Sequence, residues 1–153
     1  MRKLFIAGNW KLNKTIPEAL ELVNGLRREI GDIEEVDIAV CPVAVCLAEV
    51  ADAVGDSNIK VGAQNIYWED AGAFTGEVSA PVIKEAGAAY VILGHSERRQ
   101  FFGDTNETVN KKIKAALKHG LLPIVCIGES LEEREAGKTM DVIKKQCEGS
   151  LAG

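Results

Sequence analysis

Five short apolar runs recur along the chain at helix-length intervals, and they constrain the fold more than any other feature. Each run is rich in β-branched residues and is bounded by Gly, Pro or Asn, as strands usually are. Parallel strands covered by helices show few polar interruptions, and each parallel crossover needs about a dozen residues or more. The sequence therefore predicts an α/β fold of five parallel β/α units. The predicted strands span residues 4–7, 36–41, 59–63, 90–93 and 122–126.

The stretches between these runs carry helix signals. Thr15 and Glu18 form a capping box with Pro17 in the first turn, and apolar residues follow at helical spacing until Gly31. The β/α alternation continues without a linker, which predicts a single domain over residues 1–153. The predicted helices lie between residues 15 and 31, 44 and 54, 79 and 87, 104 and 120, and 139 and 151, with a solvated helical turn over 131–135.

The composition limits the classes of partner that we expect for this protein. The 18 basic residues are scattered among 23 acidic ones, for a formal charge of −5, so we expect no nucleic-acid partner. The first apolar run ends at Asn9, too short for a signal peptide or a membrane span, so we expect a cytoplasmic protein without membrane contact. The four cysteines form no CxxC pair and are interpreted as buried thiols, and we expect neither a metal nor a cofactor.

Polar residues follow the first and the fourth run, at the strand ends where β/α folds build their active sites. Asn9 and Lys11 follow the first run, and His95 and Glu97 follow the fourth. Taken singly, Lys11 is more often a solvated surface residue and His95 a structural one. Together they offer a cation for an anionic substrate and an imidazole beside a helix start, where free N–H groups favour the neutral form that can polarise a carbonyl.

The alternation of side chains predicts which strand faces meet. Asn9 shares a strand face with Phe5, and His95 shares one with Val91 and Leu93. If both faces turn inward, Lys11 and His95 converge. The inner face is then expected to expose a set of apolar residues, namely Phe5, Ala7, Val61, Ala63, Val91, Leu93 and Ile124.

Five motifs, in order and spacing, resemble the triosephosphate isomerase family. They are residues 9–11 (Asn-Trp-Lys), 62–65 (Gly-Ala-Gln-Asn), 72–77 (Gly-Ala-Phe-Thr-Gly-Glu), 94–99 (Gly-His-Ser-Glu-Arg-Arg) and 126–129 (Cys-Ile-Gly-Glu). The resemblance implies a partial (β/α)8 barrel. It implies Asn9 and Lys11 as substrate-binding residues, His95 as the neutral electrophile already established for this family, and Glu97 as the catalytic partner that holds Lys11.

The same resemblance implies a homodimer. The long connection over residues 62–79 would dock into a neighbouring subunit, with Thr75 near the neighbour's active site and Phe74 and Gly76 beside it. The ligand would be a small phosphate or sugar phosphate. Two local departures from the family pattern are Leu12, in place of Met, and residues 43–45, in place of a second Pro and a Phe-Thr pair.

A complete barrel of this kind has eight units in about 250 residues, whereas this sequence holds five. No Glu-Pro-Val-Trp stretch with the family's general base occurs in it. We therefore expect little or no isomerase activity unless Glu97 or Glu129 replaces that base. The alternatives are a non-catalytic protein that binds an anion or sugar phosphate, and a structural fragment. Open strand edges predict a homodimer or domain-swapped oligomer.

Overall fold

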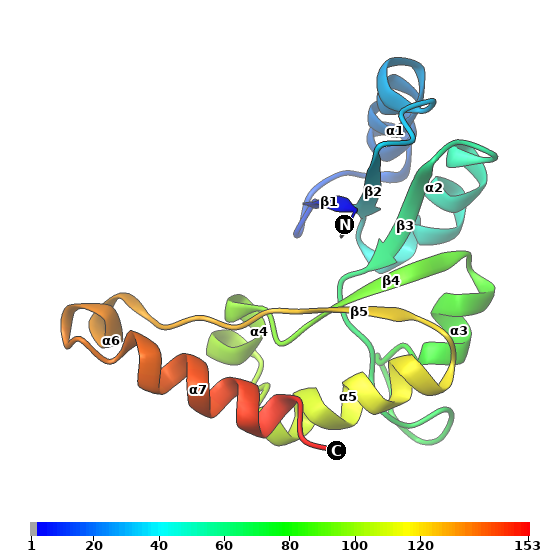
Figure 1. The fold of residues 1–153 in the computed structure, drawn as a ribbon. Coiled ribbons are helices and arrows are strands. Elements are labelled where there is room, and N and C mark those ends of the chain that lie inside the picture. The colour runs from blue at the N-terminus through cyan, green and yellow to red at the C-terminus, as the bar shows by residue number, and fades with distance from the viewer. Residues whose placement is uncertain (1–2) are drawn as a thin grey trace.

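All five predicted strands lie in one parallel sheet, in the order β1-β2-β3-β4-β5, in this computed structural model, which describes residues 3–153. Every neighbouring pair is parallel and follows the order of the sequence. The sheet bends as it passes from β1 to β5, with helices along one side, and forms a half-barrel (Figure 1). The strands are β1 (Leu4–Asn9), β2 (Val36–Cys41), β3 (Ile59–Ala63), β4 (Ala88–Leu93) and β5 (Leu122–Val125).

The helices begin and end close to where the sequence signals predict. Thr15 precedes α1, and its backbone N–H donates to Glu18 Oε2 at 2.8 Å, which completes the predicted capping box. The predicted helix over 44–54 begins with a 3₁₀ turn, and neither Val43 nor Cys46 supplies a side-chain cap. The helices are α1 (Ile16–Ile30), η1 (Ala44–Cys46), α2 (Leu47–Val54), α3 (Ala80–Glu85), α4 (Ser96–Phe101), α5 (Asn106–Lys118), α6 (Leu131–Glu135) and α7 (Thr139–Ser150).

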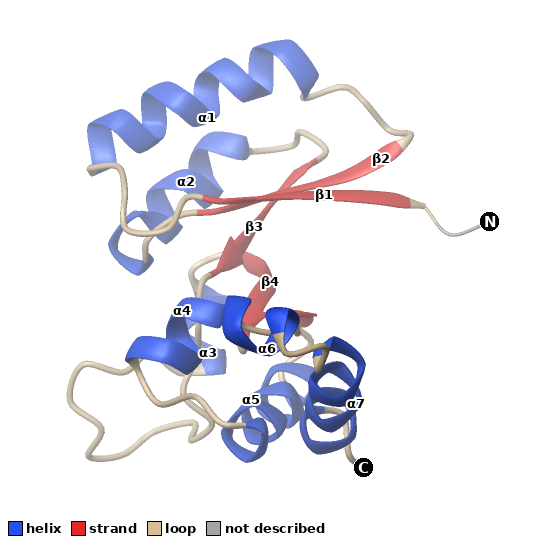
Figure 2. Ribbon diagram, turned by 90° about the vertical axis from the view of Figure 1, so that its left-hand side faces the viewer, coloured by secondary structure: helices blue, strands red, loops and turns tan. Residues whose placement is uncertain are grey.

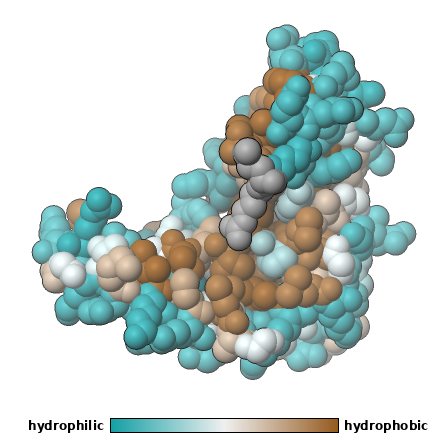
Figure 3. Space-filling model, viewed as in Figure 1, coloured by the Kyte–Doolittle hydropathy of each residue, from teal (hydrophilic) through white to brown (hydrophobic). Residues whose placement is uncertain are grey.

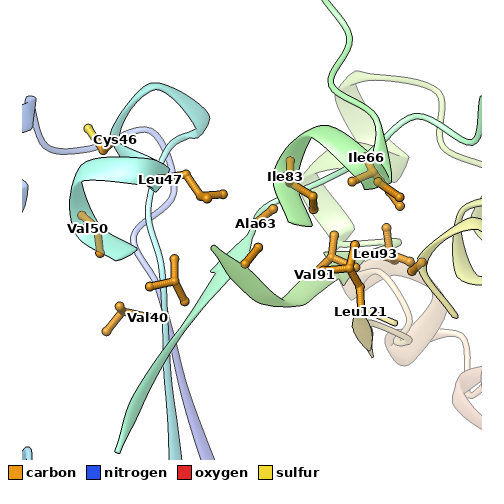
Figure 4. Close-up of a cluster of buried hydrophobic side chains, with 14 of the residues drawn as sticks. Val40, Cys46, Leu47, Val50, Ala63, Ile66, Ile83, Val91, Leu93 and Leu121 are labelled. Carbon is orange, nitrogen blue, oxygen red and sulfur yellow. The ribbon is translucent and has the colours of Figure 1, made fainter. Parts of the chain in front are cut away.

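The core lies between the sheet and its helices. Figure 2 shows α1 and α2 against one side of β1 and β2, while α5 and α7 lie side by side at the other end of the sheet. Figure 4 shows apolar side chains from strands and helices meeting in this layer. Among them are Val40, Leu47, Val50, Ala63, Ile83, Val91, Leu93 and Leu121.

The predicted inner face is wrong for β3 and β4. Val61, Ala63, Val91 and Leu93 were expected to be exposed, but each is 3% exposed or less and packs in the helix-facing core. The reason is a close contact at Gly62, where a Cβ would come within 2.8 Å of Cys41 Sγ and 3.2 Å of Tyr90 Cβ.

That contact puts Gly62 and Tyr90 on the concave face, so the residues that alternate with them turn to the helices. The prediction is confirmed for Phe5, whose ring stacks on Tyr90 with centroids 4.9 Å apart. Ile124 also lies on the concave face, because its register partner Ile92 alternates with Val91 and Leu93.

The two outer strands leave apolar surface uncovered. Within residues 3–153 no strand pairs with the outer edge of β1 or of β5. Leu4 and Ile6 of β1 and Leu122 of β5 are all more than half exposed. Figure 3 shows apolar residues gathered over the middle of the face where β4 and β5 run. We call Phe5, Leu122 and Ile124 the concave apolar face.

Two further expectations can be compared with the structure. Cys41 and Cys46 are buried as predicted, but Cys126 and Cys147 are only partly buried, and the four thiols are free. Over residues 3–153 no helix has the length and apolarity needed to cross a membrane. The two residues before Lys3, which the signal-peptide expectation also covers, lie outside the described residues.

Truncation of one core side chain tests the packing. Leu93 is fully buried, so Leu93→Ala should lower the free energy of unfolding by about 2–5 kcal/mol, the usual range for a core leucine. Leu117 on α5 is 56% exposed, and Leu117→Ala should change it by less than about 0.5 kcal/mol. Urea unfolding followed by circular dichroism measures both values, and equal losses would contradict the assigned core.

Candidate active site

A pocket of about 690 Å³ opens at the carboxyl end of the sheet. Its wall is built from the segments that follow β1, β3 and β4, which parallel pairing brings to one edge. The polar residues expected from the sequence, Asn9, Lys11, His95 and Glu97, all line it. The structure therefore brings the predicted substrate-binding and catalytic residues together, and their chemical roles remain predictions.

The backbone of Lys11 is held in an uncommon conformation. Its φ of 53° lies in the left-handed region, which non-glycine residues rarely adopt. The Lys11 N–H donates to Asn9 Oδ1 at 2.9 Å, and the Gln64 amide donates to the Lys11 carbonyl at 2.9 Å. Gln64 also donates to the Cys41 carbonyl at 2.8 Å. These bonds aim the Lys11 side chain across the pocket.

Gln64 is a residue that sequence reasoning missed. It stood within the Gly-Ala-Gln-Asn motif but received no role. Its side chain joins the segments after β1, β2 and β3, because it lines the pocket while bonding to both Lys11 and Cys41. The sequence signal that could have identified Gln64 is its position as a polar residue directly after a buried strand.

Glu97 contacts both Lys11 and His95, through different atoms. Lys11 Nζ lies 2.7 Å from Glu97 Oε1. His95 Nδ1 is bonded by the Glu97 backbone N–H, and Oε2 lies 3.4 Å from Nδ1 without a hydrogen bond when the ring is neutral. The hydrogen bond from Lys11 holds the pKa of the Glu97 carboxyl below its usual value, with smaller contributions from the charges of Lys11 and His95. Glu97 therefore stays ionised and fixes the Lys11 ammonium beside the imidazole.

His95 caps α4. Its Nδ1 accepts the Glu97 backbone N–H at 3.2 Å, so in the neutral ring the proton sits on Nε2, which is left free to donate. Strict alternation from Val91 and Leu93 would send this side chain to the helix side. Gly94, with φ of 70°, interrupts the alternation, and His95 turns into the pocket instead.

A buried ion pair lies beside the pocket. Lys112 Nζ lies 2.7 Å from Asp104 Oδ1 and donates to Asn65 Oδ1 at 3.0 Å, while Arg98 Nε lies 3.2 Å from Asp104 Oδ2. Burial lowers the pKa of Lys112, although Asp104 acts in the opposite direction. Asn65 and Arg98 both line the pocket, so this network fixes part of its wall. Sequence reasoning missed this ion pair, because a lysine on a helix is usually solvated.

The long connection after β3 is only partly at the site. Gly76 lines the pocket, whereas Thr75 is exposed and the Phe74 ring packs against Tyr67 in a tilted arrangement with centroids 4.5 Å apart. Asp70 anchors the loop to the end of α5 through Lys118 and His119. A single chain cannot bring Thr75 to a neighbour's site, so the predicted dimer interface remains a prediction.

A parallel β/α half-barrel, with polar groups from several strand ends around one pocket, places this chain among the β/α-barrel proteins. The family model described as triosephosphate isomerase matches residues 4–153, and the chain belongs to the triosephosphate isomerase family.

Similar proteins agree with this assignment. Triosephosphate isomerase of Alkaliphilus oremlandii is 58% identical over 153 residues, which are all of this chain and 61% of that protein. The enzyme of Acetivibrio thermocellus is 53% identical over 152 residues, or 99% of this chain and 60% of that protein. The crystal structure of triosephosphate isomerase from Bartonella henselae superposes with a TM-score of 0.92 at 41% identity, and covers 97% of this chain and 62% of that one. The chain thus spans about 61% of the length of the curated relatives it matches.

Removal of the Lys11 ammonium should raise the pKa of Glu97. In Lys11→Met the carboxyl loses the hydrogen bond that lowers its pKa, so its titration midpoint should move up toward that of an ordinary glutamate. Because the folded-state pKa is the lowered one, the stabilisation from this pair is present above the usual glutamate pKa and is lost as the pH falls through the lowered one. Carboxyl ¹³C NMR follows the titration.

Glu18 serves as the internal control for this titration. Its pKa is lowered by hydrogen bonds from Thr15, away from the pocket, and should stay unchanged in Lys11→Met. A Glu97 midpoint that does not move would show that Lys11 is not its main partner.

Proposed function

We propose that residues 3–153 supply the substrate-binding and electrophilic part of a triosephosphate isomerase site. The reaction is the interconversion of dihydroxyacetone phosphate and D-glyceraldehyde 3-phosphate. The observation that carries the proposal is the arrangement of Lys11, Glu97 and His95 in one pocket at the carboxyl ends of β1 and β4, where the Glu97 carboxylate pairs with Lys11 and the Glu97 backbone N–H donates to His95. Family membership over residues 4–153 supports it.

The geometry assigns separate tasks to these groups. The Lys11 ammonium faces the pocket and provides positive charge for the phosphate or the developing oxyanion of the substrate. His95 Nε2 donates a hydrogen bond to a substrate carbonyl, because Nδ1 already accepts the Glu97 amide. Asn9 and Gln64 hold the backbone that presents Lys11. None of these groups removes a proton from carbon.

Proton abstraction requires a carboxylate or similar base within hydrogen-bond reach, and such a base contributes typically about 10²–10⁴ in rate. In the described chain, the carboxylates that line the pocket are Glu77 and Glu97. Glu97 is engaged by Lys11, and its lowered pKa makes it a weak base. Glu129 instead accepts a hydrogen bond from Thr139 and lies 3.8 Å from Arg134. Glu77 is exposed, and within residues 3–153 no hydrogen bond or ion pair positions its carboxylate over the pocket. We therefore propose that these 153 residues alone bind the substrate and turn it over little or not at all.

A coupled isomerase assay, run beside titration of dihydroxyacetone phosphate by calorimetry, tests both halves of the proposal. The 153-residue chain should bind without measurable turnover, and Lys11→Met should weaken binding by about tenfold or more, the cost of losing a charged hydrogen bond. The matched control is Lys144→Met, which removes an exposed lysine on α7. Turnover that disappears in Lys11→Ala and His95→Ala would show that a substitute base exists.

A second candidate is a homo-oligomeric structural role, favoured by the uncovered strands. Within the described residues the outer edges of β1 and β5 are unpaired, and the concave apolar face lies between them. Unpaired edges beside apolar residues favour pairing with a second copy of the same chain. The copy could dock as a homodimer or by exchange of elements, and the loop with Phe74, Thr75 and Gly76 offers a separate docking surface.

Light scattering after size-exclusion chromatography tests self-association. Leu122→Lys places a charge on the concave apolar face and should shift the 153-residue chain toward monomer, because a buried unpaired charge is costly. Leu117→Lys makes the same change on α5 at nearly equal exposure, 56% against 54%, and should leave the mass unchanged. If Thr75→Arg dissociates the oligomer while Leu122→Lys does not, the long loop is the interface. A monomeric parent would contradict the oligomer.

A further inference from the structure

Arg99 joins three parts of the chain that meet behind the pocket. From its place on α4, Nε donates to the Gly94 carbonyl at 2.8 Å. Nη1 donates to Asn106 Oδ1 at 2.8 Å, at the start of α5. Nη2 lies 3.4 Å from Ser150 Oγ, at the end of α7. The planar guanidinium can serve three partners at once because its donors point in fixed directions.

The first of these partners controls His95 directly. The Gly94 carbonyl belongs to the peptide bond that joins Gly94 to His95, so holding this oxygen holds the plane from which the imidazole projects. The approach is close, since a Cβ at residue 94 would lie 3.0 Å from Arg99 Nη2 and 3.2 Å from the Cys126 carbonyl. A larger residue would push these neighbours back by a few tenths of an ångström, and the positive φ of Gly94 is the one that turns His95 into the pocket.

The other two partners of Arg99, Asn106 and Ser150, are themselves fixed by the docking of α7 on α5. Ser150 is fully buried, and its carbonyl accepts a hydrogen bond from the Asn110 amide at 3.0 Å. The Asn106 amide also donates to the Lys145 carbonyl, and a Cβ on Gly149 would lie 2.8 Å from Asn106 Cβ. These contacts fix the position in which the last turn of α7 docks on α5. Arg99 lies between this last turn and the turn before His95.

We propose that Arg99 is a positioning residue for His95, and that through Asn106 and Ser150 it makes the placement of the imidazole depend on the docking of α7. A catalytic effect of Arg99 rests on the proposed electrophilic role of His95. The geometric coupling of α7 to His95 through Arg99 does not depend on that role. Lysine at this position would keep the charge but lose the planar fork, so it could not bond to all three partners.

Imidazole ¹⁵N NMR tests the coupling. The chain has two histidines, and His119, whose Nε2 lies 2.7 Å from Asp70 Oδ1, is the internal reference. In the parent, His95 should show the tautomer with the proton on Nε2. Arg99→Lys should move both His95 nitrogens toward averaged tautomer positions, and Ser150→Ala should produce a smaller shift in the same direction. The His119 signals should not move in either variant.

A core variant separates positioning from general loss of stability. Val23→Ala truncates a buried residue of α1 and should destabilise the fold while leaving the His95 signals in place. The proposal would be overturned if folded Arg99→Lys kept the His95 signals of the parent. It would also be overturned if Val23→Ala shifted the His95 signals as much as Arg99→Lys does.

Ligand binding is read separately, so that the two proposals can fail independently. If the parent binds dihydroxyacetone phosphate, Arg99→Lys should weaken binding by a smaller factor than Lys11→Met does. An unchanged affinity of Arg99→Lys for dihydroxyacetone phosphate would overturn the link between Arg99 and the ligand site. If the parent binds nothing, the proposed function fails and the imidazole signals alone decide the positioning role.

Discussion

Parallel pairing in sequence order is the constraint on which the rest of the structure depends. It requires a helix between successive strands, and it brings every strand's carboxyl end to the same edge of the sheet. Asn9, Gln64 and His95, far apart in sequence, consequently surround one pocket. The same pairing leaves β1 and β5 with open outer edges in the described chain, so the site and the uncovered apolar surface have a common origin.

Much of the fold could be predicted, because strands and helix starts are encoded locally. The capping box at Thr15 and the five apolar runs appear in the structure close to their predicted positions. The orientation of β3 and β4 was not predicted. β4 is apolar on both faces and gives no alternation to read, whereas Lys60 of β3 shares a face with Gly62 and was a signal that sequence reasoning did not use. A contact between segments about twenty residues or more apart, Gly62 against Cys41 and Tyr90, decides which side faces the helices.

The site shows the same division. Lys11 and His95 were found because charged and titratable residues at strand ends stand out in a sequence, and the role of Glu97 was implied by the family resemblance. Lys112 and Gln64 were not found, because their roles arise from burial and from partners distant in the chain, Asp104 for the first and Cys41 for the second. The half-exposed Lys11–Glu97 pair lies in a pocket whose wall is partly fixed by the buried Lys112–Asp104 pair. Asn65 and Arg98 connect this buried pair to the wall.

The order of the strands also bears on how the chain folds. Each strand pairs with the one before it in sequence, so every new pairing closes a short loop onto structure that already exists. Short closures cost little entropy and favour rapid folding, and a chain emerging from the ribosome offers its units in this same order. β1 and β2 can meet before β5 has been synthesised. The contacts that hold Lys11 are complete once Gln64 and Glu97, which follow β3 and β4, have been translated. The contact of Arg99 with Ser150 forms only after α7 has been translated.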